Sequence, residues 1–341
     1  MPVIVDSSRS SHDCRGNPDR KPSSQLPERP CRCVTIGLIN NMPEAAFKAT
    51  ERQFVSLLNA ASEGIPVRLS LYALAGIPET KSSGSHAGSR YSGVETLWNT
   101  RLDGLIVTGR EPMSPDLRDE PYWESFTKVL EWARGNTYST VWSCLAAHAA
   151  ILHMDGIGRR KSEEKYFGVF DCALVSSHRL MAGTPPSFQV PHSRWNGVAE
   201  KELTACGYGM LARTADKEID TFVKEGDSLF VFFQGHPEYE SDTLLREYRR
   251  DVGRYFRHEM NTYPSIPRGY FDQRTETTLA TLREKAISSP NKEILASIGT
   301  ALGKTTIENP WHLTAGRIYR NWLEYIREQK NANLPRPVGA C

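Results

Sequence analysis

Short apolar runs alternate with amphipathic segments along most of the chain. The runs with strand character lie at residues 34–40, 66–72, 104–109, 138–144 and 229–233. Several are apolar almost throughout, which is typical of strands buried on both faces of a parallel sheet. The pattern therefore predicts a sheet with helices packed on its two sides.

Between and after these runs, apolar residues recur at helical spacing. The predicted helices cover residues 50–59, 124–133, 145–152, 243–256 and 316–329. Alternating strands and helices predict an α/β protein with a doubly wound, mostly parallel sheet. Prolines and a glycine interrupt the pattern at 261–273, so we expect residues 261–330 to form a helical C-terminal extension packed on the core.

The two ends of the chain differ from this core. Residues 1–33 are rich in Ser, Pro, Arg and Asp and lack hydrophobic periodicity. Such a segment buries too little apolar surface to offset its ordering entropy, so we expect a disordered polar tail. The α/β core is expected over 34–260 and a second tail over 331–341, with a mobile Ser- and Gly-rich loop at 81–92.

The composition narrows the class of protein. Lys and Arg number 42 against 40 Asp and Glu, a net charge of +2, which argues against the basic surface of a nucleic-acid binder. No apolar run is long enough to cross a membrane, and residues 1–33 lack a signal-peptide core. Of seven cysteines, the close pair Cys31 and Cys33 lacks zinc-ligand spacing. We expect a cytoplasmic protein with free thiols and no metal site.

A candidate nucleophile ends the fourth apolar run. Cys144 closes this β-rich stretch, and the Ala-rich segment 145–152 begins directly after it. A sharp strand-to-helix turn of this kind exposes a nucleophilic side chain. The helix N-terminus favours a thiolate, and the N–H of Leu145 would serve as an oxyanion-hole donor. A buried core cysteine explains the local pattern equally well.

A second candidate site follows the fifth apolar run. His236, Pro237 and Glu238 lie where this strand should end. Proline favours an extended conformation at His236, and residues two apart in extended chain project to the same side. Glu238 can therefore orient the imidazole, as in a nucleophile, base and orienter set. A turn histidine beside a surface glutamate is the alternative.

Several further stretches match a known family when they are taken together. They are residues 39–43, 50–54, 103–109, 122–123, 164–169, 191–194, 235–239, 250–251 and 321–323. As a set, in this order, they resemble the homoserine O-succinyltransferase/O-acetyltransferase family. The resemblance covers about residues 34–330 and implies a flavodoxin-like, class I glutamine-amidotransferase-like fold.

The resemblance also implies a ping-pong acyl transfer from acyl-CoA to the hydroxyl of L-homoserine. Carried over, Cys144 is the nucleophile, His236 the general base and Glu238 its orienter. Acyl-CoA would be a co-substrate, and no cofactor is implied. The expected partners are therefore these small molecules and neither nucleic acid nor membrane, with a homodimer left open.

Further positions carry over from the resemblance as substrate-binding residues. Arg250 and Glu247 match family positions that hold the amino-acid acceptor, and a planar guanidinium suits a carboxylate. Lys165 and Ser193 match positions that line the site. A surface lysine and a loop hydroxyl explain the last two equally well.

The chain departs from the family at positions that concern the substrates. Met113 aligns with a family position linked to acyl-donor choice that is usually Gly or Glu, and its bulk weakly favours acetyl over succinyl. Residues 274–304 look like an inserted helical segment. L-Serine or another hydroxy amino acid is a rival acceptor. The same residues are also consistent with a Cys-His-Glu hydrolase or amidotransferase, or with a binding module that has no activity.

Overall fold

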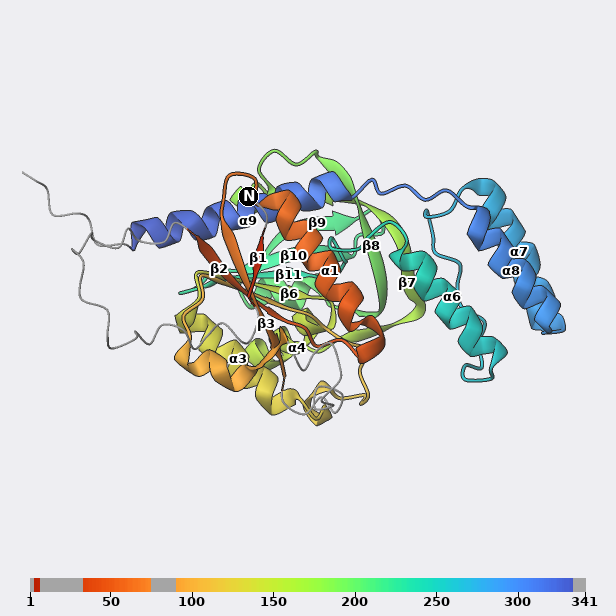
Figure 1. The fold of residues 1–341 in the computed structure, drawn as a ribbon, viewed down its shortest axis with the longest axis horizontal. Helices are drawn as coiled ribbons and strands as arrows, with labels where there is room; N and C mark the ends of the chain where they lie inside the picture. The colour runs from red at the N-terminus through yellow and green to blue at the C-terminus, as the bar shows by residue number, and fades with distance from the viewer. Residues whose placement is uncertain (1–2, 7–32, 75–89, 334–341) are drawn as a thin grey trace, which may run out of the picture. The chain divides into compact units, whose positions relative to one another are not determined.

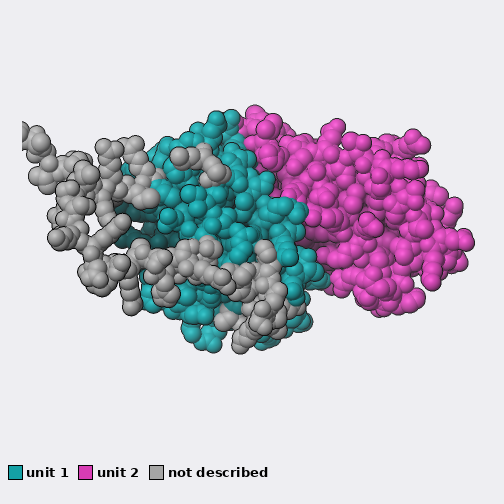
Figure 2. Space-filling model, viewed as in Figure 1, with its two compact units in different colours: residues 1–156, 223–232, 316–341 teal, residues 157–222, 233–315 magenta. Residues whose placement is uncertain are grey.

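The computed structural model describes residues 3–6, 33–74 and 90–333. The chain divides into two compact units (Figure 2). Unit 1 contains the described residues within 1–156, 223–232 and 316–341, and unit 2 contains 157–222 and 233–315. Each unit is therefore built from stretches of chain that are separated in the sequence.

The strands of unit 1 form a sheet that contains all five predicted apolar runs and two further short strands. They are β1 (Ile4–Val5), β2 (Val34–Ile39), β3 (Val67–Ala73), β4 (Ser92–Gly93), β5 (Gly104–Val107), β6 (Ser139–Ser143) and β11 (Leu229–Phe233). Their order is β1-β3-β2-β5-β6-β11, and β4 pairs with β3. The pairs β1–β3, β3–β2, β2–β5, β5–β6 and β3–β4 are parallel. The predicted parallel α/β sheet is confirmed here.

Helices cover both faces of this sheet. They are α1 (Glu44–Ala61), α3 (Trp123–Asn136), α4 (Leu145–Asp155) and α9 (His312–Ala332), with short 3₁₀ turns η2 (Val94–Asn99) and η3 (Leu117–Asp119). In Figure 1, α1 and α9 lie on one face and α3 and α4 on the other. On the α3 face, buried Trp142 packs edge-on against Phe126, with ring centroids 5.3 Å apart. On the other face, the Trp322 indole N–H donates to Ser139 Oγ at 2.8 Å.

Unit 2 contains strands that the sequence did not predict. They are β7 (Arg160–Leu174), β8 (Ser187–Gly197), β9 (Gly209–Thr214) and β10 (Ile219–Lys224), with α5 (Glu200–Ala205) and the 3₁₀ turn η4 (Arg179–Met181). Their order is β10-β9-β7-β8, and β7 pairs antiparallel with β8 and β9. The long strand β7 begins with charged residues exposed to solvent, so no continuous apolar run marked it.

Three helices pack together in unit 2. They are α6 (Thr243–Phe256), α7 (Gln273–Ser288) and α8 (Lys292–Lys304). Asp272 caps α7 and Asn291 caps α8, each through a side-chain oxygen that accepts a backbone N–H. Buried Tyr248, Leu279 and Ile298 belong to one apolar cluster that joins the three helices. The helical character predicted for 274–304 is confirmed by α7 and α8, and its being an insertion stays a prediction.

The structure differs from the predicted domain boundaries. The helices predicted as one extension over 261–330 are divided, because α9 packs on the sheet of unit 1 whereas α7 and α8 pack on α6. Residues 4–5 pair with β3 as a strand instead of belonging to a polar tail. The rest of that predicted tail, most of the 81–92 loop and most of the 331–341 tail lie outside the described residues. Among the described helices, none combines the length and the apolar character needed to span a membrane.

Candidate active site

Cys144 lies at a sharp turn between β6 and α4 in unit 1. Its backbone has φ 52° and ψ −116°, a left-handed region that few residues other than glycine adopt. The side chain is half-buried and not in a disulfide. A non-glycine residue held in this conformation stores strain of about 1–3 kcal/mol, and such strain gathers at functional sites. The predicted strand-to-helix elbow is therefore present.

Gly109 packs against the N-terminus of α4. A Cβ at this position would lie 2.6 Å from the backbone nitrogen of Leu145 and 2.7 Å from that of Ala146. Only glycine allows the chain after β5 to approach this closely. The first N–H groups of a helix have no acceptor within the helix. The N–H of Leu145 therefore has the local geometry expected of an oxyanion donor beside Cys144.

His236 and Glu238 meet in the turn that follows β11. Nδ1 of His236 lies 2.9 Å from Oε1 of Glu238, and their side chains are only 12% and 5% exposed. Burial makes this contact strong, because water competes little for either group. The contact predicted between the two residues is present. It leaves Nε2 as the imidazole nitrogen that would act on a substrate proton.

Tyr239 links this pair to the helix α6. Its ring stacks on the His236 imidazole with centroids 4.2 Å apart and planes 17° apart. Its hydroxyl donates to Oε1 of Glu247 at 2.6 Å. Its carbonyl accepts the indole N–H of Trp311 at 2.8 Å. In the sequence, Tyr239 stands out only as part of a matching stretch, although an aromatic residue next to a candidate base was a usable signal.

The predicted substrate residues of unit 2 form one polar cluster. Ser193 Oγ donates to Oε2 of Glu247 through a short hydrogen bond of 2.5 Å. The Lys165 ammonium lies 3.9 Å from that carboxylate and 3.3 Å from the carboxylate of Asp251. Arg250 pairs with Asp251 at 2.8 Å and keeps 53% of its side chain exposed. Lys165, Ser193 and Arg250 are therefore gathered around the carboxylates of Glu247 and Asp251.

Met113 lies in unit 1, on the stretch after β5. Its side chain is 58% exposed. Its backbone N–H donates to Oε1 of buried Glu120 at 2.6 Å, and that of Ser114 donates to the same oxygen at 2.8 Å. Glu120 therefore fixes the backbone of this stretch. The influence of Met113 on donor choice stays a prediction.

Unit 2 also contains three buried side chains with the spacing of metal ligands. One candidate atom each from Cys172, His192 and Asp220 lies within 4.8 Å of the others. Burial lowers the pKa of His192 to about 4 and raises that of the Cys172 thiol. For Asp220, burial favours the neutral form, but the close contact with His192 and the hydrogen bond from Thr221 outweigh it and hold the pKa below its usual value.

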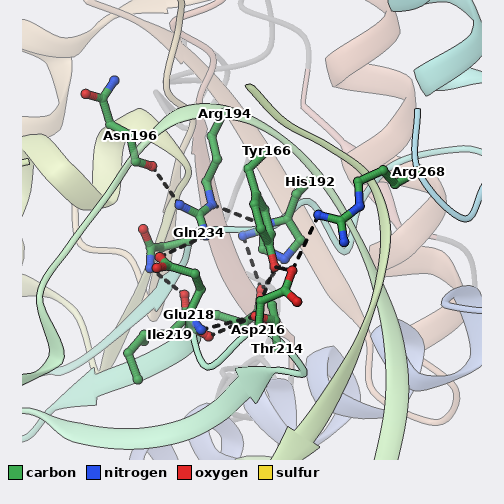
Figure 3. A network of polar contacts seen from close by, with 12 residues as sticks. Tyr166, His192, Arg194, Asn196, Thr214, Asp216, Glu218, Ile219, Gln234 and Arg268 are labelled. Carbon is green, nitrogen blue, oxygen red and sulfur yellow. Dashed lines mark hydrogen bonds and ion pairs between the residues drawn. The ribbon is translucent and has the colours of Figure 1, made fainter. Parts of the chain in front are cut away.

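This group was not predicted from the sequence, and its neighbours argue against a cation. The Arg194 guanidinium donates to Nδ1 of His192 at 3.4 Å and is almost fully buried. A fixed positive charge at this distance opposes a second cation. Figure 3 shows Arg194 between His192 and the carbonyl of Asn196, with Tyr166 beside them. The group is better described as a hydrogen-bonded network.

The structure places the predicted site residues in both units. Unit 1 contains Cys144, Leu145 and Met113, and unit 2 contains His236, Glu238, Lys165, Ser193, Glu247 and Arg250. Within unit 2, contacts join the base to its orienter and all four substrate residues to one another or to Asp251. The pairing of Cys144 with His236 stays a prediction.

Comparisons with known proteins agree over nearly the whole chain. The family model described as homoserine O-succinyltransferase matches residues 23–333. A protein named homoserine O-succinyltransferase from Rhodopseudomonas palustris is 42% identical over 329 residues, which is 94% of each chain. A protein of the same name from Bradyrhizobium japonicum is 42% identical over 300 residues, covering 86% of this chain and 90% of its own. A solved glutamine amido transferase from Methylobacillus flagellatus is similar with a TM-score of 0.45 and 13% identity, covering 86% of this chain and 95% of that chain.

Proposed function

Because the chain belongs to the homoserine O-succinyltransferase family, we propose that it moves a succinyl group from succinyl-CoA to the hydroxyl of L-homoserine. The acyl group passes through a thioester on Cys144. The observation that carries this mechanism is the buried contact of 2.9 Å between His236 and Glu238. It supplies a base with a fixed orientation in the matching stretch that the family resemblance assigns to catalysis.

In the first half-reaction, the thiolate of Cys144 attacks the carbonyl carbon of the acyl-CoA thioester. The strained turn presents the sulfur, and the N–H of Leu145 stabilises the oxyanion that forms. The tetrahedral intermediate collapses with cleavage of the carbon–sulfur bond to CoA. His236, which holds the proton removed from the Cys144 thiol, gives it to the CoA thiolate as it leaves, and this yields the acyl-enzyme and free CoA.

In the second half-reaction, His236 takes the proton from the hydroxyl of homoserine. The oxygen attacks the acyl-enzyme, and the thiolate of Cys144 is the leaving group. Glu238 stabilises the imidazolium that forms and fixes which ring nitrogen carries the proton, as an acidic orienter does in hydrolytic triads. Exclusion of water by the bound acceptor favours transfer over hydrolysis.

The polar cluster on α6 supports an amino-acid acceptor. We assign Arg250 to the α-carboxylate, because a half-exposed guanidinium can make two parallel hydrogen bonds to it. We assign Glu247 to the α-ammonium group of the same molecule. Such a pair recognises the amino-acid moiety and leaves the side-chain hydroxyl for transfer. L-Serine therefore remains the rival acceptor.

The choice of acyl donor also depends on a residue of this chain, Met113. The relatives named above support succinyl, whereas Met113 in place of Gly or Glu favours the smaller acetyl group. A mismatch of one or two methylene groups changes the activation free energy that sets kcat/KM by about 1–3 kcal/mol. We expect a preference between the two donors that Met113→Gly and Met113→Glu shift in opposite directions.

Intact-protein mass spectrometry tests the function directly. The protein is mixed separately with succinyl-CoA and acetyl-CoA, and the mass of any adduct identifies the donor. The adduct is then chased with L-homoserine, L-serine or buffer alone. Rapid loss with homoserine supports the proposal, whereas equal loss in buffer would identify a hydrolase. Absence of an adduct with both donors, together with absence of turnover, would refute it.

We also propose that the protein acts in the cytoplasm. Both proposed substrates are small metabolites, and Cys144 must remain a reduced thiol for the reaction. Fractionation of cells that express the protein at its natural level tests this. Recovery in the cytoplasmic fraction supports the proposal, and recovery with membranes would contradict it.

A further inference from the structure

The turn that carries His236 is fixed by hydrogen bonds on both sides. The backbone N–H of His236 donates to the carbonyl of Pro191 in β8 at 2.8 Å. The N–H of Gln234 donates to the carbonyl of Asp220 in β10 at 2.8 Å. Between them, the N–H of Gly235 donates to the Asp220 carboxylate at 3.2 Å. A buried side chain therefore replaces a strand carbonyl as the acceptor directly before the proposed base.

The Asp220 carboxylate is itself held by a chain of polar groups. Oδ1 lies 3.3 Å from Nε2 of His192, and Arg194 Nε donates to Nδ1 of the same ring at 3.4 Å. Because Nδ1 accepts from arginine, the proton of the neutral ring is on Nε2, the nitrogen that faces Asp220. Thr221 Oγ1 donates to the other oxygen of Asp220 at 2.5 Å. The carboxylate thus accepts hydrogen bonds from Thr221 and Gly235 and lies beside the His192 ring.

The turn packs directly on this network. A Cβ at Gly235 would lie 2.7 Å from Oδ1 of Asp220, 3.0 Å from Cε1 of His192 and 2.5 Å from Cγ1 of Val190. The distances to Asp220 and Val190 are shorter than real Cβ contacts and the distance to His192 is at their lower limit, so the backbone at Gly235 packs closely against all three side chains. Any displacement of Asp220 is therefore transmitted to the residue before His236.

We propose that Asp220, oriented by His192 and Arg194, is a positioning residue that fixes the His236 turn for acyl transfer. The proposal rests on the proposed function for the role of His236. It also gives the matching stretch 191–194 a physical purpose. Pro191 accepts the N–H of His236, His192 and Arg194 hold Asp220, and Ser193 donates to Glu247.

Substitutions at Asp220 separate an acceptor role from a structural role. Asp220→Asn keeps an oxygen for the N–H groups of Gly235 and His192, whereas Asp220→Leu has a similar volume and no acceptor. We expect Asp220→Leu to lower kcat roughly 100-fold, as displacement of a catalytic group by about 1 Å does, and Asp220→Asn to retain most of it. The KM for homoserine should stay unchanged in both, because the cluster on α6 is not altered.

Asp216→Leu is the matched control. Asp216 is a half-exposed carboxylate on the same face of unit 2, paired with Arg268 and Tyr166, and it does not touch the turn. We expect wild-type kcat for this variant. Wild-type kcat in a folded Asp220→Leu protein would overturn the proposal. Equal losses in the Leu and Asn variants, or a parallel rise in KM, would overturn it too.

A second pair of variants decides the matter if Asp220→Leu does not fold. His192→Gln places an amide donor near the position of Nε2, whereas His192→Phe keeps an aromatic ring and removes the polar contacts with both Arg194 and Asp220. We expect His192→Gln to retain markedly more of the wild-type kcat than His192→Phe. Equal kcat values in the two variants would overturn the proposal.

Nuclear magnetic resonance separates this proposal from the proposed function. The ¹⁵N shifts of His192 should report a neutral ring with the proton on Nε2, and the Gly235 amide should exchange slowly with solvent. Exchange at Gly235 should become faster in His192→Phe and not in Asp216→Leu. A protein without transfer activity would refute the function, and these measurements would still decide whether Asp220 holds the turn. Rapid Gly235 exchange in the wild type would overturn the positioning role.

Discussion

The two units hold their proposed catalytic residues by different physical means. In unit 1, the backbone itself is strained, with Cys144 at φ 52° and Gly109 packed against the first N–H groups of α4. In unit 2, the turn of His236 has no such strain and is fixed by hydrogen bonds to Pro191 and Asp220.

The strained turn of unit 1 and the hydrogen-bonded turn of unit 2 depend on different conditions. Backbone strain persists only while the surrounding packing enforces it, and it does not depend on protonation. A polar network depends on which groups carry protons and on each donor having an acceptor. Unit 1 should therefore respond to changes of backbone freedom, and unit 2 to pH and to changes of hydrogen bonding.

The largest expected effect comes from removing the sulfur while the strained turn is kept. Cys144→Ala retains Cβ and the backbone conformation, so the protein should fold as the wild type does. Turnover should fall at least about 10⁴-fold, as it does when the nucleophile of a catalytic triad is removed. Intact-protein mass spectrometry should detect no acyl adduct. Full turnover by this variant would show that another residue is the nucleophile.

The second-largest expected effect concerns Arg250, which we assign to the carboxylate of the amino-acid acceptor. Arg250→Ala should cost about 2–5 kcal/mol in kcat/KM for homoserine, because a charged hydrogen bond to the substrate is lost. Acylation of Cys144 by the donor should be almost unchanged, because that half-reaction precedes acceptor binding. Stopped-flow measurement of the two half-reactions checks this.

Arg249→Ala is the control for that experiment. Arg249 is an exposed arginine one position earlier on the same helix, and its removal should leave both half-reactions unchanged. Arg250 pairs with Asp251 at 2.8 Å, so the experiment decides between a surface ion pair and a clamp for the substrate. Equal slowing of both half-reactions in Arg250→Ala, or of neither, would contradict its role as the carboxylate clamp.

The polar network of unit 2 should make stability depend on pH. Burial lowers the pKa of His192 to about 4 in the folded protein, against about 6.5 when unfolded. Below pH 6.5 this histidine binds a proton in the unfolded chain but not in the native protein, so protonation favours unfolding. The stability that the neutral His192 provides above pH 6.5 is therefore lost as the pH falls toward 4. The slope from this residue is at most about 1.4 kcal/mol per pH unit.

Urea unfolding between pH 7.5 and pH 4.5 measures this slope. Asp220 on β10, Cys172 on β7, Arg194 on β8 and His236 in the turn face the ring and set its charge balance. His192→Gln should show a smaller loss of stability on acidification than the wild type. His312→Gln, at an exposed position, should follow the wild type. Identical slopes in wild type and His192→Gln would show that the ring is not held neutral.

The smallest effect tests the strain in unit 1. Cys144→Gly and Cys144→Ala are both expected to be inactive, but only glycine adopts φ 52° without strain. The strain energy that glycine removes is larger than the free-energy cost of its greater loss of backbone entropy on folding. Cys144→Gly should therefore be more stable than Cys144→Ala by about 1 kcal/mol. Chemical denaturation of the two variants measures the difference. Greater stability of the alanine variant would mean that the turn is not strained.

The same contrast explains how far the sequence alone could be interpreted. The sheet of unit 1 and the elbow at Cys144 follow from local signals, because apolar strands and a small-residue helix are adjacent in the chain. The helix α6 was predicted with its observed bounds, Thr243–Phe256, for the same reason. Local pattern also brought His236 and Glu238 together, since they are two residues apart.

What the sequence did not predict depends on distant contacts. Asp220 lies in a strand without an exceptional pattern, and its partners His192 and Gly235 come from residues 28 positions earlier and 15 later. The early part of β7 is charged and exposed, so periodicity gave no strand there. The C-terminal extension was predicted as one part, whereas the structure divides it between the two units. The contact that assigns α9 to unit 1, between Trp322 and Ser139, joins residues 183 positions apart, so no local pattern could indicate it.

That last contact has a consequence for the order in which a ribosome releases the protein. Most of α9 is made after every residue of unit 2, yet it covers the face of unit 1 that contains Ser139 and Gly104. The part of unit 1 within residues 1–156 is therefore made early, and the area of its sheet that α9 covers stays exposed until α9 has been made. Exposed apolar surface of this kind is what chaperones bind and what aggregation begins from. The nascent chain is most vulnerable between residues 156 and 316, long after its nucleophile has been synthesised.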